Sequence, residues 1–75
     1  MSTNGQLDQR PRAQAALAKS PIFELRDLQV ERREDGVLLI CGIVSSYYHK
    51  QLAQEAVRSV CGGAEVVNSI CVNQA

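Results

Sequence analysis

The dipeptide Asp35-Gly36 separates two segments with different hydrophobic patterns, and it constrains the fold more than any other feature of the sequence. From Leu28 to Arg33 the residues alternate between two faces, as in a strand with one side exposed to water. Gly36 can adopt the positive φ that tight hairpin turns require. We therefore predict an antiparallel hairpin, with Gly36 as a structural residue of its turn.

The strand after this turn is expected to lie centrally in a sheet. Residues Val37 to Val44 are apolar at almost every position, which is typical of a strand covered on both faces or flanked on both sides. Gly42 interrupts the run. A glycine inside a strand indicates a bulge or the close approach of another backbone, so Gly42 is predicted to have a structural role.

A helix and a final strand are predicted after this segment. Ser46 is suited to cap the helix, and a serine cap is worth about 1 kcal/mol relative to Ala. Gly62 is expected to end the helix in the left-handed conformation. The last strand should span Ala64 to Val72, and it should run parallel to the strand before the helix because a helix connects the two. The apolar positions at helical spacing are Leu52, Ala53, Ala56, Val57 and Val60.

The N-terminal region divides into a tail and a short helix. Residues 1–10 are polar and show no periodicity, so we predict a flexible tail, with the folded domain spanning 11–75. Pro11 suits a first helical turn. The ring of Pro21 disfavours helical geometry at Ser20, so the first helix should end near this point. Its apolar face is expected to contain Ala13, Ala16 and Leu17.

Length and charge limit the possible functions. A chain of 75 residues forms one small domain, without room for a deep enzyme pocket. Eight basic residues balance eight acidic ones, so the chain lacks the basic excess that drives nucleic-acid binding. No apolar stretch resembles a signal peptide or is long enough to cross a bilayer, and we expect a cytoplasmic location.

The three cysteines predict no disulfide framework. Cys41, Cys61 and Cys71 are odd in number and lack CxxC spacing, which fits free thiols in a reducing compartment. Together with His49 they contain the donors of a Cys₃His zinc site, but the paired short spacings of such sites are absent. We therefore predict no metal and no cofactor, and expect the cysteines to be small buried hydrophobic residues.

The order helix, strand, strand, helix, strand, with these turn and cap residues, resembles the BON domain family. The resemblance covers roughly Ala16 to Val72. It implies an α+β fold, an αββαβ two-layer sandwich with both helices on one face of a three-stranded mixed sheet. It also implies a module without catalysis that binds phospholipid or other ligands. The matching features are Asp35-Gly36, Gly42, Ser46, Ala53, Ala56, Gly62 and the segment VVNSICV, residues 66–72.

The candidate binding site is the start of the second helix. Free N–H groups and the helix dipole favour an anion there, and the side chains of Ser45, Ser46, His49 and Lys50 add donors for a phosphate group. Tyr47 and Tyr48 have the amphipathic character of residues that anchor proteins at membrane interfaces. The favoured alternative is that the cluster only begins the helix, with Ser46 as cap and Tyr48 covering the edge of the core. No activated partner or pocket supports His49 as a general base, so no catalytic residue is predicted.

Three functions remain open. The first is a module that binds a membrane phospholipid surface or another anionic ligand. The alternative is a protein interaction module or a self-association module, which would form a homo-oligomer. Such a module would use the exposed sheet face. An apolar patch is expected there from Leu39 or Leu38, Val67 and Cys71. Nucleic-acid binding ranks third because the chain is neutral and has few aromatic residues. Asn68, which interrupts an apolar strand, is expected to be structural and to bond a neighbouring loop or bulge.

Overall fold

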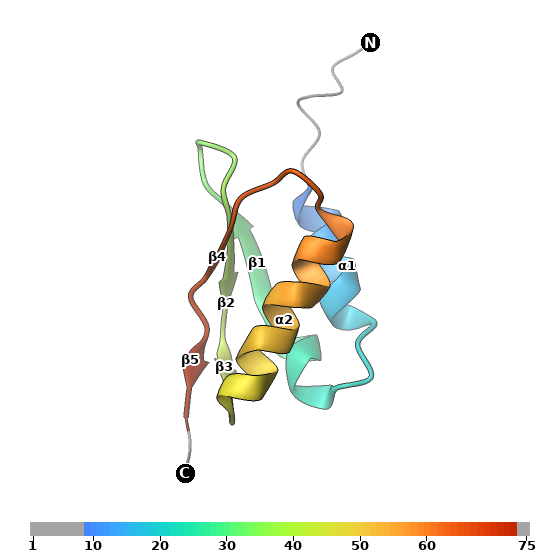
Figure 1. The fold of residues 1–75 in the computed structure, drawn as a ribbon, viewed down its shortest axis with the longest axis vertical. Coiled ribbons are helices and arrows are strands. Elements are labelled where there is room, and N and C mark those ends of the chain that lie inside the picture. The colour runs from blue at the N-terminus through green and yellow to red at the C-terminus, as the bar shows by residue number, and fades with distance from the viewer. Residues whose placement is uncertain (1–8, 74–75) are drawn as a thin grey trace.

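The computed structural model describes residues 9–73, and in this range the chain forms two helices, a 3₁₀ turn and five short strands (Figure 1). Strands β1, β2 and β4 form one sheet in that order, and β3 pairs with β5. The predicted α+β class is confirmed. In chain order the elements are α1 (Arg10–Ala18), η2 (Phe23–Asp27), β1 (Gln29–Arg32), β2 (Leu38–Cys41), β3 (Ile43–Val44), α2 (Tyr47–Val60), β4 (Val66–Asn68) and β5 (Cys71–Val72).

The core lies between the helices and one face of the sheet, as the resemblance implied (Figure 1). Leu38 and Ile40 of β2 are buried, whereas their neighbours Leu39 and Cys41 are only half-buried. This alternation shows that the helices cover one face of β2 and leave the other uncovered. The buried residues facing the sheet from the helices are Ala13, Leu17, Ala53 and Val57.

The hairpin joins β1 and β2 as predicted. The two strands pair antiparallel, with Val30 opposite Ile40. The Arg33 N–H donates to the Val37 carbonyl at 2.9 Å, and the Gly36 N–H donates to the Arg33 carbonyl at 2.9 Å. Gly36 has φ of 89°. A turn followed by a residue with positive φ is the usual conformation of a three-residue hairpin loop, and Gly36 has the positive φ that the sequence indicates for it.

The two later strands each contain one interruption that the sequence only partly predicted. The predicted strand 37–44 is divided at Gly42, and the predicted strand 64–72 is divided at Ser69 and Ile70. The same parallel register nevertheless continues from Leu38 opposite Val66 to Val44 opposite Val72. The N–H groups of Ser69 and Cys71 bond the carbonyls of Ile40 and Gly42 across the interruption. We call the combined outer strand the β4–β5 strand.

Gly42 is needed at the interruption for two reasons. Its φ is 140°, a conformation that side chains rarely adopt. A Cβ atom at this position would lie 2.5 Å from Cδ2 of Leu28, which is buried in the core. The predicted close approach is therefore present, although the nearest group is a side chain rather than another backbone.

Helix α2 begins as predicted and ends differently. Ser46 is its N-cap, and the Ser46 hydroxyl accepts the N–H of His49 at 3.1 Å. The prediction of a left-handed Gly62 is wrong, because the positive φ, 87°, belongs to Gly63. The Ala64 N–H bonds the Cys61 carbonyl at 3.1 Å, and Gly63 is the third residue of this turn. A turn with positive φ at its third position favours glycine there, so the chain reverses one residue later than expected.

Helix α1 begins at Arg10, one residue before the predicted domain start, and it ends before Ser20 as expected. Its apolar face contains Ala13 and Leu17, which are buried, whereas Ala16 is half-buried. Of the predicted tail, residues 1–8 lie outside the described residues.

Candidate functional site

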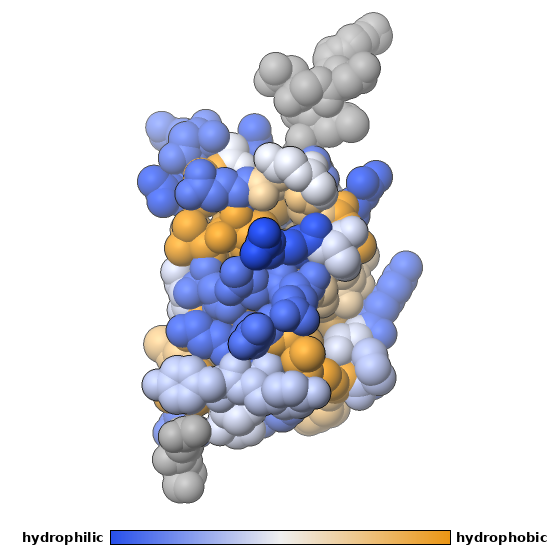
Figure 2. All heavy atoms as spheres, in the orientation of Figure 1, coloured by the Kyte–Doolittle hydropathy of each residue, from blue (hydrophilic) through white to orange (hydrophobic). Residues whose placement is uncertain are grey.

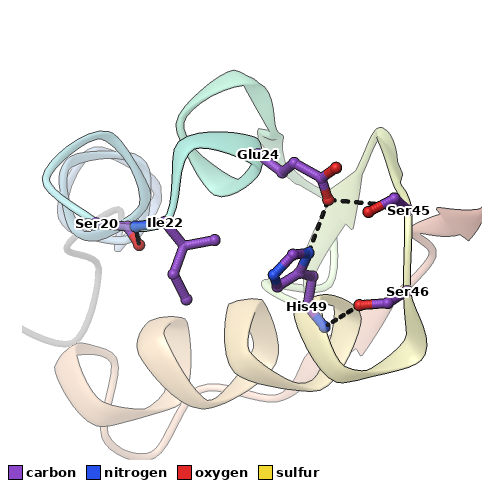
Figure 3. A network of polar contacts seen from close by, with 6 residues as sticks. All are labelled: Ser20, Ile22, Glu24, Ser45, Ser46 and His49. Carbon is purple, nitrogen blue, oxygen red and sulfur yellow. Dashed lines mark hydrogen bonds and ion pairs between the residues drawn. The ribbon is translucent and has the colours of Figure 1, made fainter.

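The start of α2 already holds a carboxylate from elsewhere in the chain (Figure 3). Oε1 of Glu24, in η2, accepts the backbone N–H of Ser45 at 2.9 Å and lies 2.8 Å from Nδ1 of His49. The Ser45 hydrogen bonds lower the pKa of the Glu24 carboxyl, and the hydrogen bond to His49 lowers it further. A carboxylate of the chain itself therefore lies at this helix start, next to the residues for which an anionic ligand was expected.

This arrangement engages three of the five predicted site residues within the chain. Ser45 donates its backbone N–H to Glu24, and the Ser46 hydroxyl caps the helix through the N–H of His49. His49 faces Glu24 through Nδ1. The sequence does not indicate this pairing because strands β1, β2 and β3 lie between Glu24 and His49, and no local pattern connects the two residues.

Tyr47 and Lys50, the other two predicted site residues, line a separate groove on the β4 side of α2. This open groove has a volume of about 310 Å³. Asn68 of β4 forms its floor and fixes α2 over the strand: Nδ2 of Asn68 donates to the Lys50 carbonyl at 2.9 Å and to Oε1 of Gln54 at 3.2 Å. Oδ1 of Asn68 accepts the N–H of Ile70 at 3.2 Å. Asn68 thus satisfies its amide locally, as predicted for a structural residue.

Large hydrophobic side chains gather at the end of the molecule where α2 begins. Phe23 in η2, Ile43 in β3, and Tyr47 and Tyr48 in α2 are 73%, 66%, 66% and 70% exposed. Phe23 and Ile43 line one shallow depression. In Figure 1, η2, β3 and the start of α2 lie together at this end. We call these four residues the apolar tip.

The exposure of Tyr48 corrects the prediction that it covers the core edge. One helical turn before the buried Ala53, the inward position is occupied by His49, so Tyr48 projects outward beside it. The ring centroids of Tyr48 and His49 are 5.9 Å apart.

The uncovered sheet face is a second apolar surface. Leu39 and Val67 are opposite each other in the β2–β4 ladder and are half-buried, whereas Leu38 is buried. Leu39 is therefore the residue on this face, which resolves the alternative left open by the sequence. Cys41 is half-buried and Cys71 is exposed.

The cysteines have three different environments, and the expectation that all are buried is wrong for Cys71. Cys71 lies opposite the exposed Ile43, outside the core. All three are free thiols. Burial raises the pKa of the Cys41 and Cys61 thiols, which disfavours the reactive thiolate. Within residues 9–73 no three His, Cys, Asp or Glu side chains are grouped so as to hold a metal ion.

The chain is thus a small α+β sandwich with a capped helix start, a polar groove and two apolar surfaces. The family model for the BON domain matches residues 8–74, and the chain belongs to this family. BON domains are generally non-catalytic binding modules. No curated protein and no solved structure matches the chain. Over the described range, neither helix has the length and apolarity needed to cross a membrane.

Proposed function

We propose that this BON domain binds a phospholipid membrane surface through the apolar tip. The observation that carries the proposal is the gathering of Phe23, Ile43, Tyr47 and Tyr48 at one end of the molecule with more than half of each side chain exposed. Exposing large apolar side chains together is unfavourable in water and typical of a contact surface. Tyrosine suits the membrane interface because its ring is apolar and its hydroxyl remains hydrated.

The charges around the tip favour binding by shallow insertion of apolar side chains over binding by attraction to charged lipid headgroups. Glu24 and Asp27 line the depression between Phe23 and Ile43, and they would repel anionic lipid. Lys50 lies near Tyr47 on the other side of the helix start. The proposal therefore retains Tyr47 and Lys50 from the predicted anion site, and assigns Ser45, Ser46 and His49 to the structure of the helix start.

Co-sedimentation with vesicles tests this proposal. The wild-type chain is expected to bind phosphatidylcholine vesicles, and added phosphatidylglycerol should change binding little, because Lys50 attracts an anionic surface whereas Glu24 and Asp27 repel it. Phe23→Ser and Tyr48→Ser should each weaken binding by at least about threefold, since burying an aromatic ring contributes on the order of 2 kcal/mol at full insertion. Both side chains are exposed, so the fold should be unaffected.

Two further variants complete the test. Lys50→Ala should bind less well to vesicles that contain phosphatidylglycerol, because Glu24 and Asp27 then remain without this nearby cation. His49→Ala should bind both kinds of vesicle like the wild type, because His49 faces Glu24. Leu39→Ser, on the uncovered sheet face, is the matched control and should bind vesicles like the wild type. Absence of vesicle binding, or equal losses in Leu39→Ser and Phe23→Ser, would refute membrane binding through the tip.

A second candidate function is self-association through the uncovered sheet face. The specific observation is that Leu39 and Val67 are partners in the β2–β4 ladder, that Cys41 follows Leu39 on the same face of β2, and that no helix covers this face. Light scattering over a range of concentrations distinguishes the two candidates. A dimer that Leu39→Ser dissociates would support self-association, and a monomer at all concentrations would exclude it.

A further inference from the structure

The outward backbone groups of the two outer strands differ in their hydrogen bonding. At β1 the side chain of Gln14, from α1, bonds the outward backbone groups: its Nε2 donates to the Leu28 carbonyl at 2.7 Å, and its Oε1 accepts the Val30 N–H at 2.9 Å. Gln14 thus occupies the place of a neighbouring strand. The β1 edge is closed to pairing at these positions.

The opposite edge, the β4–β5 strand, is open except at Ile70, whose N–H donates to Oδ1 of Asn68. Its parallel register directs the N–H groups of Val67, Ser69, Cys71 and Asn73 toward β2 and β3. The N–H and carbonyl groups of Val66, Asn68 and Val72 therefore face away from the sheet. Among the described residues no hydrogen bond closes these groups. In Figure 1 this strand forms the outer border of the sheet, with α2 beside it.

The groove between α2 and this edge carries excess positive charge. Lys50, Gln54 and Arg58 follow one another at intervals of four residues, so they lie in a row on one face of α2. Within the described part of the chain, no ion pair or hydrogen bond engages the side-chain nitrogens of Lys50 or Arg58. The acidic lining residue, Glu55, accepts a hydrogen bond from Gln51 at 3.3 Å. Figure 2 shows the hydrophilic surface that covers α2.

We propose that the β4–β5 edge binds an extended acidic peptide segment of a partner protein as an additional strand. The peptide backbone would pair with the outward groups of Val66, Asn68 and Val72, which is how strand addition gains affinity. Successive side chains of a strand point to opposite faces. Alternate acidic residues would therefore face Lys50 and Arg58 over the groove, and the residues between them would extend the apolar surface of Leu39 and Val67.

The charges favour such a peptide over a second copy of this chain. Pairing of two β4–β5 edges about a two-fold axis would bring the row of Lys50 and Arg58 beside the same row of the partner copy. Like charges next to an edge oppose self-pairing. An acidic segment instead neutralises both cations.

Amide NMR with a defined probe tests the proposal. The probe is a synthetic peptide of about six residues that alternates Glu and Val, matching the usual length of a strand. A peptide that alternates Lys and Val is the control. We expect the acidic peptide to shift the amide signals of Val66, Asn68 and Val72, and to slow their hydrogen exchange, because these N–H groups become donors to the peptide. The basic peptide should do neither.

Charge reversal tests the groove. Arg58→Glu should weaken binding of the acidic peptide by about fivefold, as expected for loss of an exposed charge pair. Lys19→Glu, an exposed charge reversal at the end of α1, is the matched control and should bind like the wild type. Equal binding of both peptides, unprotected Val66 and Asn68 amides, or equal effects of the two variants would overturn the proposal. Protection of these amides by concentration alone would assign the edge to a second copy and overturn it as well.

Discussion

At the scale of single residues, different physical constraints require glycine at positions 36 and 42. Gly36 and Gly42 both have positive φ, at 89° and 140°. A Cβ at Gly36 would meet no atom within 4 Å, whereas one at Gly42 would collide with Leu28. The cost of a side chain at Gly36 is thus purely conformational, and at Gly42 it includes displacement of a core residue.

We predict that Gly42→Ala destabilises the domain more than Gly36→Ala does. Gly36→Ala should cost about 1 kcal/mol, the usual penalty for a side chain in the left-handed region. Gly42→Ala should lower the free energy of unfolding by about 1 to 3 kcal/mol more than Gly36→Ala does, because overpacking adds to the backbone strain. Urea unfolding of both variants measures the difference. Equal midpoints would show that Leu28 moves aside without cost.

The carboxyl of Glu24 should make stability depend on pH. Its pKa is lowered from the ordinary value of 4.5 by the Ser45 hydrogen bonds and by His49. A lowered pKa in the folded state stabilises the fold above the ordinary value, and this stabilisation is lost as the pH falls through the lowered pKa. When the pH is lowered from 6 into the acid range, the wild type should therefore lose more free energy of unfolding than Glu24→Gln, which has no charge to titrate at this position. Parallel pH dependences in urea unfolding would contradict this role of Glu24.

At the scale of elements, α2 depends on its cap. The Ser46 hydroxyl accepts the His49 N–H, a group that the helix itself leaves without a partner. Ser46→Ala should lower the free energy of unfolding by roughly 0.5 to 2 kcal/mol. Ser46→Asp is the control, because its carboxylate can also cap, and it should retain most of the stability. A Ser46→Ala variant as stable as the wild type would mean that water replaces the cap without loss.

The edge of β1 depends on Gln14 in a comparable way. Gln14→Leu removes both hydrogen bonds to the backbone at Leu28 and Val30. Leaving part-buried backbone groups without partners costs about 1 to 3 kcal/mol. The variant should also acquire a second open edge and aggregate at lower concentration than the wild type. Thermal unfolding with light scattering measures both effects, and a stable, monomeric variant would show that Gln14 does not protect the edge.

At the scale of the whole molecule, the features that the sequence predicted are those that depend on residues close together in the chain. Gly36 and Ser46 act on groups within a few positions, so their turn and cap could be recognised from pattern alone. The contacts of Glu24 with His49, and of Gln14 with β1, join segments brought together only by folding. No local pattern encodes such pairs. The sequence therefore indicated the cap at Ser46, but it did not indicate that Glu24 lies against Ser45 and His49.

The same distinction explains the error at the end of α2. A glycine pair offers two positions for the left-handed residue, and the choice is decided by the turn that directs the chain into β4. Sequence alone does not specify that direction. The burial of Leu38 rather than Leu39 likewise depends on which face of β2 the helices cover.

The two proposed binding surfaces share Lys50, but Phe23 of the tip and Arg58 of the groove should act independently. The tip contains Tyr47 and Tyr48 at the start of α2, and Arg58 lies near its end, about 16 Å further along the helix axis. Sites separated by more than roughly 10 Å usually do not couple. Phe23→Ser should therefore weaken vesicle binding and leave the acidic peptide affinity unchanged, whereas Arg58→Glu should do the reverse, and the double variant should show the sum of both losses. Vesicle binding that changes more than about threefold on saturation with peptide would instead show that the surfaces are linked, and would place the peptide and the membrane in one binding event.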